Sequence, residues 1–269
     1  MSGSTLAQVM RRLPAMTKHS EQQFVEFMFQ SADLKGMPKQ HSAYMVATSF
    51  AINEILVFLR LTLLTANSLK VAKGDDERLA GFAFLQDQIL MRSLSARAVE
   101  YLKLAKDHRT VCERAKDTAG LAFFETYSTV LDGLWDDPVT AVAITIRNKL
   151  TGHVELTRIR DTISGIPEDR RETGIYLHQK DGNSIYLMGE DIAHIGAFES
   201  SEEIQAWSDW VLNTCRAIQS LHHAYMIWAI ETFFPEKIGQ EIRLHPDSEL
   251  VGTFNDGIPV LWDFPYKTD

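Results

Sequence analysis

The sequence predicts an all-α protein, an up-and-down helical bundle with a small β-hairpin insertion and an extended C-terminal segment. Between residues 38 and 234, apolar residues recur at helical spacing over long stretches, and capping residues or prolines mark the ends of those stretches. One alternating apolar pattern near 174–189 interrupts them. The last stretch, 235–269, holds four prolines and only short apolar pieces. These observations divide the chain into 1–37, 38–234 and 235–269.

Composition narrows the class of protein. The chain has 269 residues, of which 45% are apolar and 23% charged, as is usual for a soluble globular protein with a large core. A formal net charge of −9 argues against a protein that coats nucleic acid, because such binding neutralises phosphates with Lys and Arg. It leaves room for an enzyme that touches RNA at one small basic site.

Cysteine content and hydropathy indicate the compartment. Cys112 and Cys215 lie far apart without a CxxC pattern, which predicts two reduced, buried thiols in a cytoplasmic protein. The longest apolar run, 55–66, is interrupted by Arg60 and is shorter than the roughly 20 residues that a membrane span needs. We therefore expect a core helix there, no membrane partner and no secretory signal at the N-terminus.

The segment 1–37 is predicted to hold short helices. Ser20 is a candidate N-cap, and Gln23 three residues later completes a capping box. The helix behind it would bury Phe24, Phe27 and Met28 and end near Gly36.

Four helices are expected next, and their ends carry local signals. Pro38 suits a first helical position, and Pro138 begins the helix that carries the most chemically interesting residues. A short link at Lys73-Gly74-Asp75 predicts that the first two helices pack antiparallel. The expected ranges are 38–71, 77–107, 110–134 and 138–164.

Different patterns follow the fourth helix. Alternating apolar residues on both sides of Asp181-Gly182 predict a β-hairpin near 174–189. Ser200 or Ser201 then caps a last long helix, which ends before Pro235. We expect the remainder, 235–269, to be an extended strap that docks on the body or on a second subunit.

The stretch ITIRNKLTGHVE, residues 144–155, carries the clearest chemistry. It places Arg147, Asn148 and His153 close together in the sequence. An Arg stabilises charge on a phosphorane, and a His moves a proton near neutral pH, so the pair suits phosphodiester cleavage without a metal. Asn148 would orient the His or the phosphate by hydrogen bonding.

This motif, Arg147-Asn148 followed by His153 after four residues, resembles the signature of the HEPN superfamily (higher eukaryotes and prokaryotes nucleotide-binding domains). The resemblance implies an all-helical up-and-down bundle and a homodimer in which two motifs face one another. It implies a metal-independent endoribonuclease without cofactors, of the kind found as toxins and abortive-infection effectors. It also implies an antitoxin or regulatory protein as partner. Other members of the family are inactive binding modules.

Helix geometry adds a condition to this hypothesis. Residues six apart on a straight α-helix lie about 120° apart around its axis, so Arg147 and His153 would not share one stripe. A two-fold dimer seam would supply the complementary pair. Lys149 and, less directly, Glu54 are candidates for supporting roles around the motif.

Each candidate functional residue also has a purely structural interpretation. Arg147 and His153 would equally serve a non-catalytic dimerisation or interaction module, as a capping and ion-pairing pair. Adjacent histidines on a helix point about 100° apart, so His222 and His223 with Cys215 predict structural roles and no metal site. The tryptophans of the last helix predict core or dimer interface; they are Trp207, Trp210 and Trp228.

Overall fold

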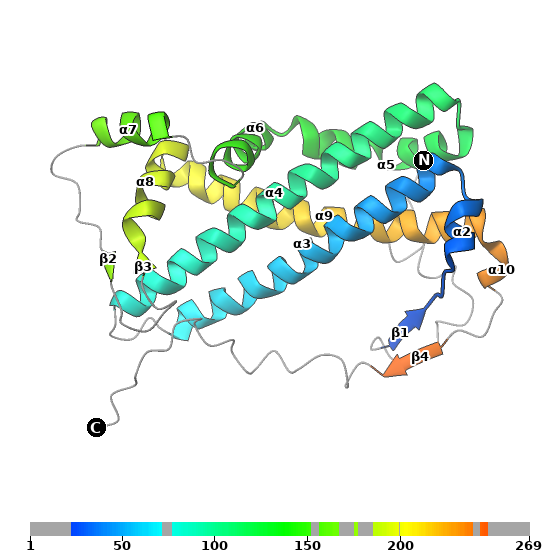
Figure 1. Cartoon of the computed structure of the whole chain (residues 1–269), viewed down its shortest axis with the longest axis horizontal. Helices are drawn as coiled ribbons and strands as arrows, with labels where there is room; N and C mark the ends of the chain where they lie inside the picture. The colour runs from blue at the N-terminus through cyan, green and yellow to red at the C-terminus, as the bar shows by residue number, and fades with distance from the viewer. Residues whose placement is uncertain are drawn as a thin grey trace. The chain divides into compact units, whose positions relative to one another are not determined.

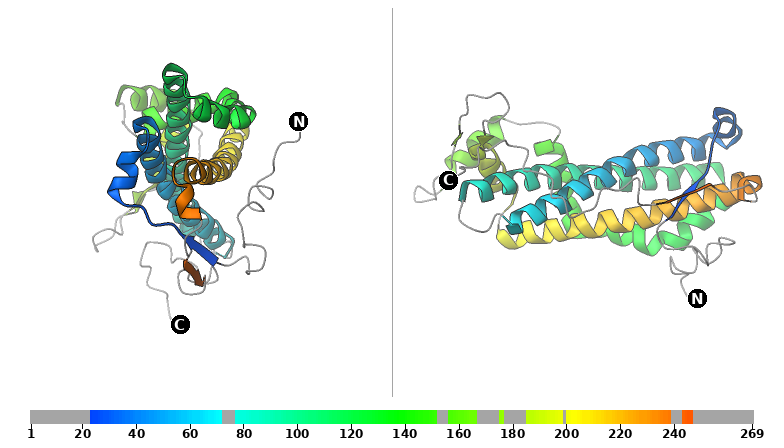
Figure 2. Two further views of the ribbon diagram at one scale, coloured as in Figure 1. Left: turned by 90° about the vertical axis from the view of Figure 1, so that its right-hand side faces the viewer. Right: turned by 90° about the horizontal axis from the view of Figure 1, so that it is seen from below.

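The chain forms an all-α helical bundle, which confirms the predicted fold class (Figure 1). The computed structural model describes residues 23–71, 77–151, 156–166, 175–176, 185–198, 200–238 and 243–246. The helices are α2 (Ser31–Gly36), α3 (Lys39–Val71), α4 (Glu77–Ala115), α5 (Thr118–Asp136), α6 (Pro138–Ile146), α7 (Leu156–Ser164), α8 (Leu187–Ala197), α9 (Ser201–Phe233) and α10 (Pro235–Ile238). A π-helical turn, η2 (Arg147–Thr151), follows α6 directly. Figures 1 and 2 show α3, α4 and α9 as long helices.

Two short antiparallel β-pairs accompany the helices. Strand β2 (Ile175–Tyr176) pairs with β3 (Ile185–Tyr186), as the hairpin prediction required. Strand β1 (Gln23–Glu26) pairs with β4 (Arg243–Pro246), which ties the C-terminal segment to the start of the described chain. The Asp181-Gly182 turn lies outside the described residues.

Local signals explain the best-predicted helix ends. The Asp137 carboxylate accepts a hydrogen bond from the Val139 backbone N–H at 2.9 Å, with Pro138 in the first turn of α6. The Ser200 hydroxyl accepts one from the Glu203 backbone N–H at 3.2 Å at the start of α9. Both caps satisfy backbone donors that a helix leaves without an internal partner.

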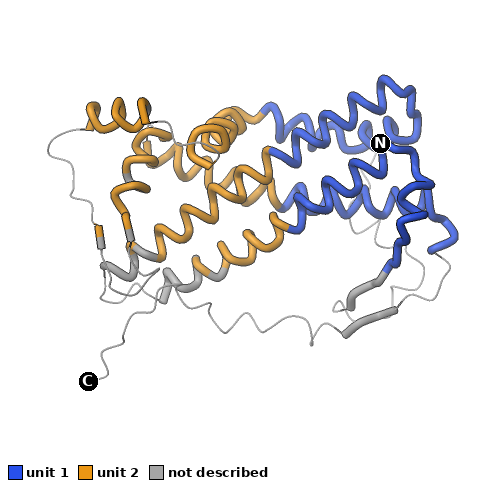
Figure 3. The backbone as a smooth tube through the Cα atoms, in the orientation of Figure 1, with its two compact units in different colours: residues 1–53, 100–136, 216–253 blue, residues 54–99, 137–215, 254–269 orange. Residues whose placement is uncertain are grey.

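The described chain divides into two compact units, each built from three separate segments (Figure 3). Unit 1 comprises 1–53, 100–136 and 216–253, and unit 2 comprises 54–99, 137–215 and 254–269. Helices α3, α4 and α9 contribute residues to both units. The division of the chain at 38 and 235 stays a prediction.

Within each unit, α3 and α4 run antiparallel, as the short link between them predicted. In unit 2, Gln86 of α4 donates to the Thr65 hydroxyl of α3 at 3.0 Å, and Arg97 of α4 pairs with Glu54 of α3. Residues later in α4 therefore contact residues earlier in α3, as antiparallel helices do. In unit 1, the Tyr44 ring of α3 stacks on His108 of α4 with centroids 4.2 Å apart.

The core of unit 2 centres on Trp207 of α9. Its indole is fully buried and donates to the Ser95 hydroxyl at 3.1 Å. Helix α8 contacts both α6 and α7 and is joined to α4 by the Arg92–Glu190 ion pair at 2.8 Å. Cys215 is buried and free.

In unit 1 the core is aromatic. Tyr44, Tyr101, Phe124 and Tyr225 are all buried. At its edge, Lys237 of α10 pairs with Asp33 of α2 at 2.9 Å. Cys112 is buried and free here, so both thiols are buried as predicted.

Three sequence-based boundaries are wrong. Residues 23–26 form strand β1 in place of a helix, because the pairing with β4 satisfies the backbone there; the Ser20 cap lies outside the described residues. The second long helix continues to Ala115, past the break expected at 107–110. The second hairpin strand ends at Tyr186, where α8 begins without having been predicted.

Two further expectations need correction. The C-terminal segment begins with the helical turn α10 and not with extended chain. The fourth helix is not one straight α-helix from 138 to 164, because a π-helical turn occupies Arg147–Thr151. Residues 72–76, including the Gly74 link, lie outside the described part.

One helical segment in the described residues meets the length and composition criterion for a membrane span. It is Lys39–Leu63 of α3, with mean hydropathy 1.6. Of the 18-residue stretch that meets the criterion, 28% is buried. One such segment carries little weight, since core helices of soluble proteins meet the same criterion. It also buries His41 and Thr48, whose polar atoms bond within unit 1.

Candidate functional site

The first half of the predicted motif lies on the π-helical turn of unit 2. The Arg147 backbone N–H donates to the carbonyls of Ala143 and Ile144, at the junction between α6 and η2. The Arg147 guanidinium Nη1 donates to the Asn148 side-chain Oδ1 at 2.9 Å. Asn148 and Lys149 are exposed, and Arg147 is half-buried. The structure therefore brings Arg147 and Asn148 into direct contact on an accessible turn.

The second half of the motif, Gly152 and His153, lies outside the described residues. The turn before it is wider than an α-helix: π-helices bond residues five apart, and the Thr151 hydroxyl also donates to the Ile146 carbonyl, at 3.4 Å. The 120° separation between Arg147 and His153 assumed α-helical geometry throughout, whereas Arg147–Thr151, the described part of that span, is π-helical. π-Helical turns occur frequently at functional sites.

Glu54 has a partner of its own. Its Oε2 lies 2.7 Å from Nε of Arg97, and both side chains are partly exposed. The pair links α3 and α4 within unit 2. A supporting role for Glu54 or Lys149 beside the motif stays a prediction.

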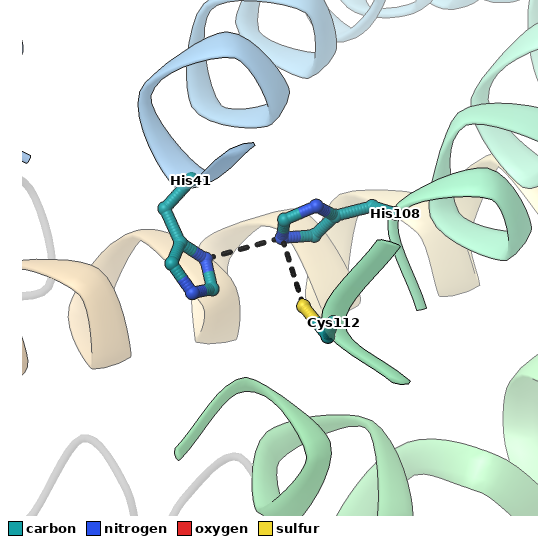
Figure 4. Close-up of side chains that lie close together, drawn as sticks. All are labelled: His41, His108 and Cys112. Atoms are coloured by element: carbon teal, nitrogen blue, oxygen red, sulfur yellow. Dashed lines mark hydrogen bonds between the residues drawn. The ribbon is translucent and has the colours of Figure 1, made fainter. Parts of the chain in front are cut away.

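A second cluster, which the sequence analysis did not single out, lies in unit 1. It comprises His41, His108 and Cys112, and all three are buried. Their ligating atoms lie within 4.8 Å of one another. Figure 4 shows the two imidazole rings and the thiol side by side, with His108 between the other two. His41 Nδ1 is 3.1 Å from His108 Nε2, and Cys112 Sγ is 3.8 Å from the same Nε2.

Helix geometry explains how these residues meet. His108 and Cys112 are four residues apart on α4, so both side chains lie on one face of that helix. His41 comes from the first turn of α3. The spacing His-x3-Cys is visible in the sequence, but only the antiparallel packing of α3 and α4 within unit 1 brings His41 to it.

Asp117 forms the outer side of the cluster. Its Oδ2 contacts His41 Nε2, and its Oδ1 accepts from the Gly120 backbone N–H at 3.0 Å, which caps the start of α5. A β-carbon on Gly120 would lie 2.8 Å from Cys112 Sγ and 3.0 Å from Asp117 Oδ2. The close approach of α5 to the cluster therefore requires glycine at this position.

The α4–α5 corner that positions Asp117 is a Schellman motif. Lys116 has φ 54°, in the left-handed region, and its N–H donates to Glu113 O at 3.1 Å. The Asp117 N–H donates to Cys112 O at 2.9 Å. Lysine holds a conformation here that glycine adopts more easily, so no glycine marks this helix end in the sequence.

An apolar shell and the burial of the cluster shift its titrations. Burial and the neighbouring His41 lower the pKa of His108 to about 4. Burial, followed by the Asp117 carboxylate, raises the pKa of the Cys112 thiol to about 12. Burial raises the pKa of Asp117, but hydrogen bonds from Gly120 and His41 outweigh it and hold that pKa below its ordinary value.

The other candidates have structural environments. His222 is buried with its ring 6.0 Å from that of Tyr101, and burial lowers its pKa to about 4. Trp207 and Trp210 are buried, as the core prediction required, while Trp228 is half-buried and contacts the His41 ring at 5.2 Å.

Unit 1 also has a surface pocket of about 270 Å³ between α4 and α5. Its charges are internally compensated: Arg109 pairs with Asp132 at 3.2 Å, and the Lys106 ammonium lies 4.4 Å from the centre of the Trp135 ring. Two of its cations therefore have partners within the pocket itself.

Comparison of the chain with protein-family models, with curated proteins and with solved structures found no match.

Proposed function

We propose that this protein is a metal-independent endoribonuclease of HEPN type. The observation that carries the proposal is the Arg147-Asn148-x4-His153 motif within an all-α bundle, the fold that the resemblance implies. The π-helical turn at Arg147–Thr151 supports it, because such turns are frequent where helices carry function.

The reaction is cleavage of RNA by its own 2′-hydroxyl. His153 takes the proton from the 2′-OH while the 2′-oxygen forms a bond to phosphorus and the bond from phosphorus to the 5′-oxygen breaks. The 5′-oxygen receives a proton from a second, protonated His153. The products are a 2′,3′-cyclic phosphate and a 5′-hydroxyl, with no net oxidation or reduction and no cofactor.

Arg147 and Asn148 have separate tasks in this scheme. The guanidinium stabilises the charge that develops on the non-bridging phosphate oxygens. The Asn148 carbonyl oxygen, 2.9 Å from Arg147 Nη1, limits the directions in which the guanidinium points. The exposure of Asn148 and Lys149 leaves the turn accessible to a phosphate backbone.

The active form in this proposal is a homodimer, because two copies of His153 act as base and acid. Two apolar side chains on α7, the helix that follows the motif in sequence, support association there. Leu156 is 81% exposed and Ile163 is 54% exposed, and residues seven apart share a helix face. A two-fold contact through this face would bring two motifs together.

The cellular role that fits this activity is that of a cytoplasmic toxin or abortive-infection effector. An uncontrolled ribonuclease harms its own cell, so an antitoxin or a regulatory protein would restrain it. This assignment follows from the family resemblance and the proposed chemistry.

Cleavage of a labelled RNA pool in EDTA tests the proposal, with the wild type compared with His153→Ala. His223→Ala is the matched control, since His223 is exposed and lies on α9. We expect wild type and control to cleave, and His153→Ala to lose activity by roughly 100-fold or more, the usual contribution of a general acid–base residue. An all-deoxy substrate of the same sequence should survive.

Equal cleavage by wild type and His153→Ala would overturn the proposal, as would cleavage of the all-deoxy strand. If neither protein cleaves RNA while both are folded and dimeric, the non-catalytic interaction module becomes the better description. Far-UV circular dichroism in the same EDTA buffer reports folding. Sedimentation of Leu156→Ser against Val130→Ser, a change at an apolar residue of unit 1 that is 45% exposed, tests the dimer contact.

A further inference from the structure

We propose that His41, His108 and Cys112 in unit 1 bind one zinc ion. The site is separate from the Arg147 motif, which belongs to unit 2. The inference therefore does not depend on ribonuclease activity. It departs from the expectation of a metal-free protein, which rested on the HEPN resemblance.

The three ligating atoms have the chemistry and the spacing for zinc. Two imidazole nitrogens and one thiolate are ligands that zinc prefers over magnesium or calcium. Zinc–nitrogen and zinc–sulfur bonds of about 2.0–2.3 Å in a tetrahedron separate nitrogens by about 3.3 Å, and nitrogen from sulfur by about 3.6 Å. The structure has 3.1 Å between the two nitrogens and 3.8 Å from His108 Nε2 to Cys112 Sγ. All three ligating atoms lie within 4.8 Å of one another, so the third pair, His41 Nδ1 and Cys112 Sγ, closes by up to about an ångström when the ion binds.

Asp117 supplies the outer contact that zinc-binding histidines usually have. Ligating imidazoles commonly donate their other N–H to a carboxylate, which fixes the tautomer and the ring orientation. The Asp117 carboxylate contacts His41 Nε2, and a carboxylate accepts, so Nε2 is the donating nitrogen; Nδ1, on the other side of the ring, lies 3.1 Å from His108 Nε2. The same carboxylate caps α5, which holds it in place independently of the imidazole.

The charges of the cluster balance around a divalent cation. A zinc ion with two neutral imidazoles and one thiolate carries one positive charge, and the Asp117 carboxylate cancels it. Buried charge is tolerated only when it is compensated, and His41, His108 and Cys112 are no more than 5% exposed. The Tyr225 hydroxyl, 3.3 Å from His41 Nδ1, or a water would complete the tetrahedron.

The surrounding packing is that of a built site. Tyr44 stacks on the His108 ring, and Phe233 and Trp228 lie 5.0 and 5.2 Å from the His41 ring, between ring centroids. Such an apolar shell limits solvent access to a metal. The ion would join the start of α3 to the end of α4, and so stabilise the fold of unit 1 by linkage.

Zinc binding by the untagged full-length chain tests the inference. The metal content after gel filtration in a zinc-containing buffer and titration against a chromophoric chelator give the stoichiometry and the affinity. The variants are Cys112→Ser and His108→Gln. Their matched controls are Cys215→Ser and His222→Gln, which change a buried cysteine and a buried histidine outside the cluster.

We expect the wild type to bind one zinc ion per chain. The zinc affinity should fall by roughly 100-fold or more in both cluster variants, because removing a first ligand costs at least as much as removing an outer contact. Both controls should keep the wild-type affinity. Cobalt(II) gives a second readout that needs no cluster variant. Cys215→Ser retains a single thiol, so a thiolate-to-cobalt absorption band in that protein must come from Cys112.

Several outcomes would overturn the inference. They are a folded wild type that takes up no zinc at micromolar concentration, zinc binding that survives both cluster variants, and a cobalt complex of Cys215→Ser without a thiolate band. A failure of ribonuclease activity has no bearing on these measurements. A loss of zinc likewise leaves the test of His153 intact.

Discussion

Asp117 holds the His41 ring with one carboxylate oxygen and caps helix α5 with the other. The two contacts fix each other's geometry, because the cap orients the carboxylate that the imidazole contacts. Both residues belong to unit 1 and are separated by 76 positions in the chain. Their contact links the first turn of α3 to the α4–α5 corner.

Replacement of Asp117 separates its two roles. Asp117→Ala removes the cap and the contact with His41, and we expect it to lower the free energy of unfolding by about 2–4 kcal/mol. Asp117→Asn keeps an N-cap residue and is expected to cost only about 1 kcal/mol. Urea unfolding followed by circular dichroism measures both. Equal losses in the two variants would contradict a separate capping role.

Lys116 is predicted to be a site of easy stabilisation. Its φ of 54° is unfavourable for a residue with a β-carbon. Lys116→Gly should raise the free energy of unfolding by about 0.5–1 kcal/mol, after the added chain entropy of glycine is counted. Lys116→Ala is the control and should change little, since alanine has the same β-carbon. A gain from alanine equal to that from glycine would disprove the backbone explanation.

Two glycines of α5 are expected to respond in opposite directions to alanine. At Gly120 a β-carbon would meet Cys112 Sγ at 2.8 Å, so Gly120→Ala should destabilise the protein by about 1–3 kcal/mol. At Gly133 no atom of the described residues lies within 4 Å of such a carbon. Gly133→Ala should therefore stabilise α5 by about 1 kcal/mol, through helix propensity. Thermal unfolding of both variants measures the difference, and a change of the same sign would argue against the close packing at Gly120.

Two tryptophans of α9 provide a matched pair in unit 2. The Trp207 indole donates to the Ser95 hydroxyl, whereas the buried Trp210 indole N–H has no acceptor among the described residues. Trp207→Phe should thus cost about 1–2 kcal/mol more than Trp210→Phe, because it leaves a buried hydroxyl unpaired. Adding Ser95→Ala to Trp207→Phe should recover part of the loss. Urea unfolding of the three variants checks this, and equal costs would rule out a net contribution from the hydrogen bond.

Asp87 of unit 2 makes stability depend on pH. Burial raises its pKa from 3.8 to about 6. Between these values the folded chain keeps a proton that the unfolded chain has lost, so this contribution to stability falls as pH rises through that window. Asp87→Asn should be more stable than wild type at about pH 7.5, and the gain should vanish below the lower pKa. Unfolding midpoints measured across this range test the sign; a gain that is constant with pH would contradict it.

Local patterns determined most of the secondary structure. The cap at Asp137-Pro138 and the cap at Ser200 fixed the starts of α6 and α9, because each signal acts within a few residues of sequence. The alternation around 174–189 was enough to predict the paired strands β2 and β3. The Arg147–Asn148 contact was also accessible to sequence reasoning, since the two residues are neighbours.

Boundaries that depend on distant partners were not predictable in this way. Strand β1 forms by pairing with β4, more than 200 residues away, and not through any local preference. Helix α4 runs on to Ala115 because the corner after it uses a lysine in a left-handed conformation where a glycine would have signalled the end.

The sequence by itself determined an all-α bundle, a hairpin and a motif suited to phosphodiester chemistry, because helical periodicity, turn residues and adjacent side chains are local properties. Only the tertiary structure decided that His41 meets His108 and Cys112. Those residues belong to two helices, 67 positions separate the two histidines, and no local rule sets the pairing of helices in space. The His-x3-Cys spacing on α4 was visible beforehand, but its third member and the Asp117 carboxylate come from packing alone.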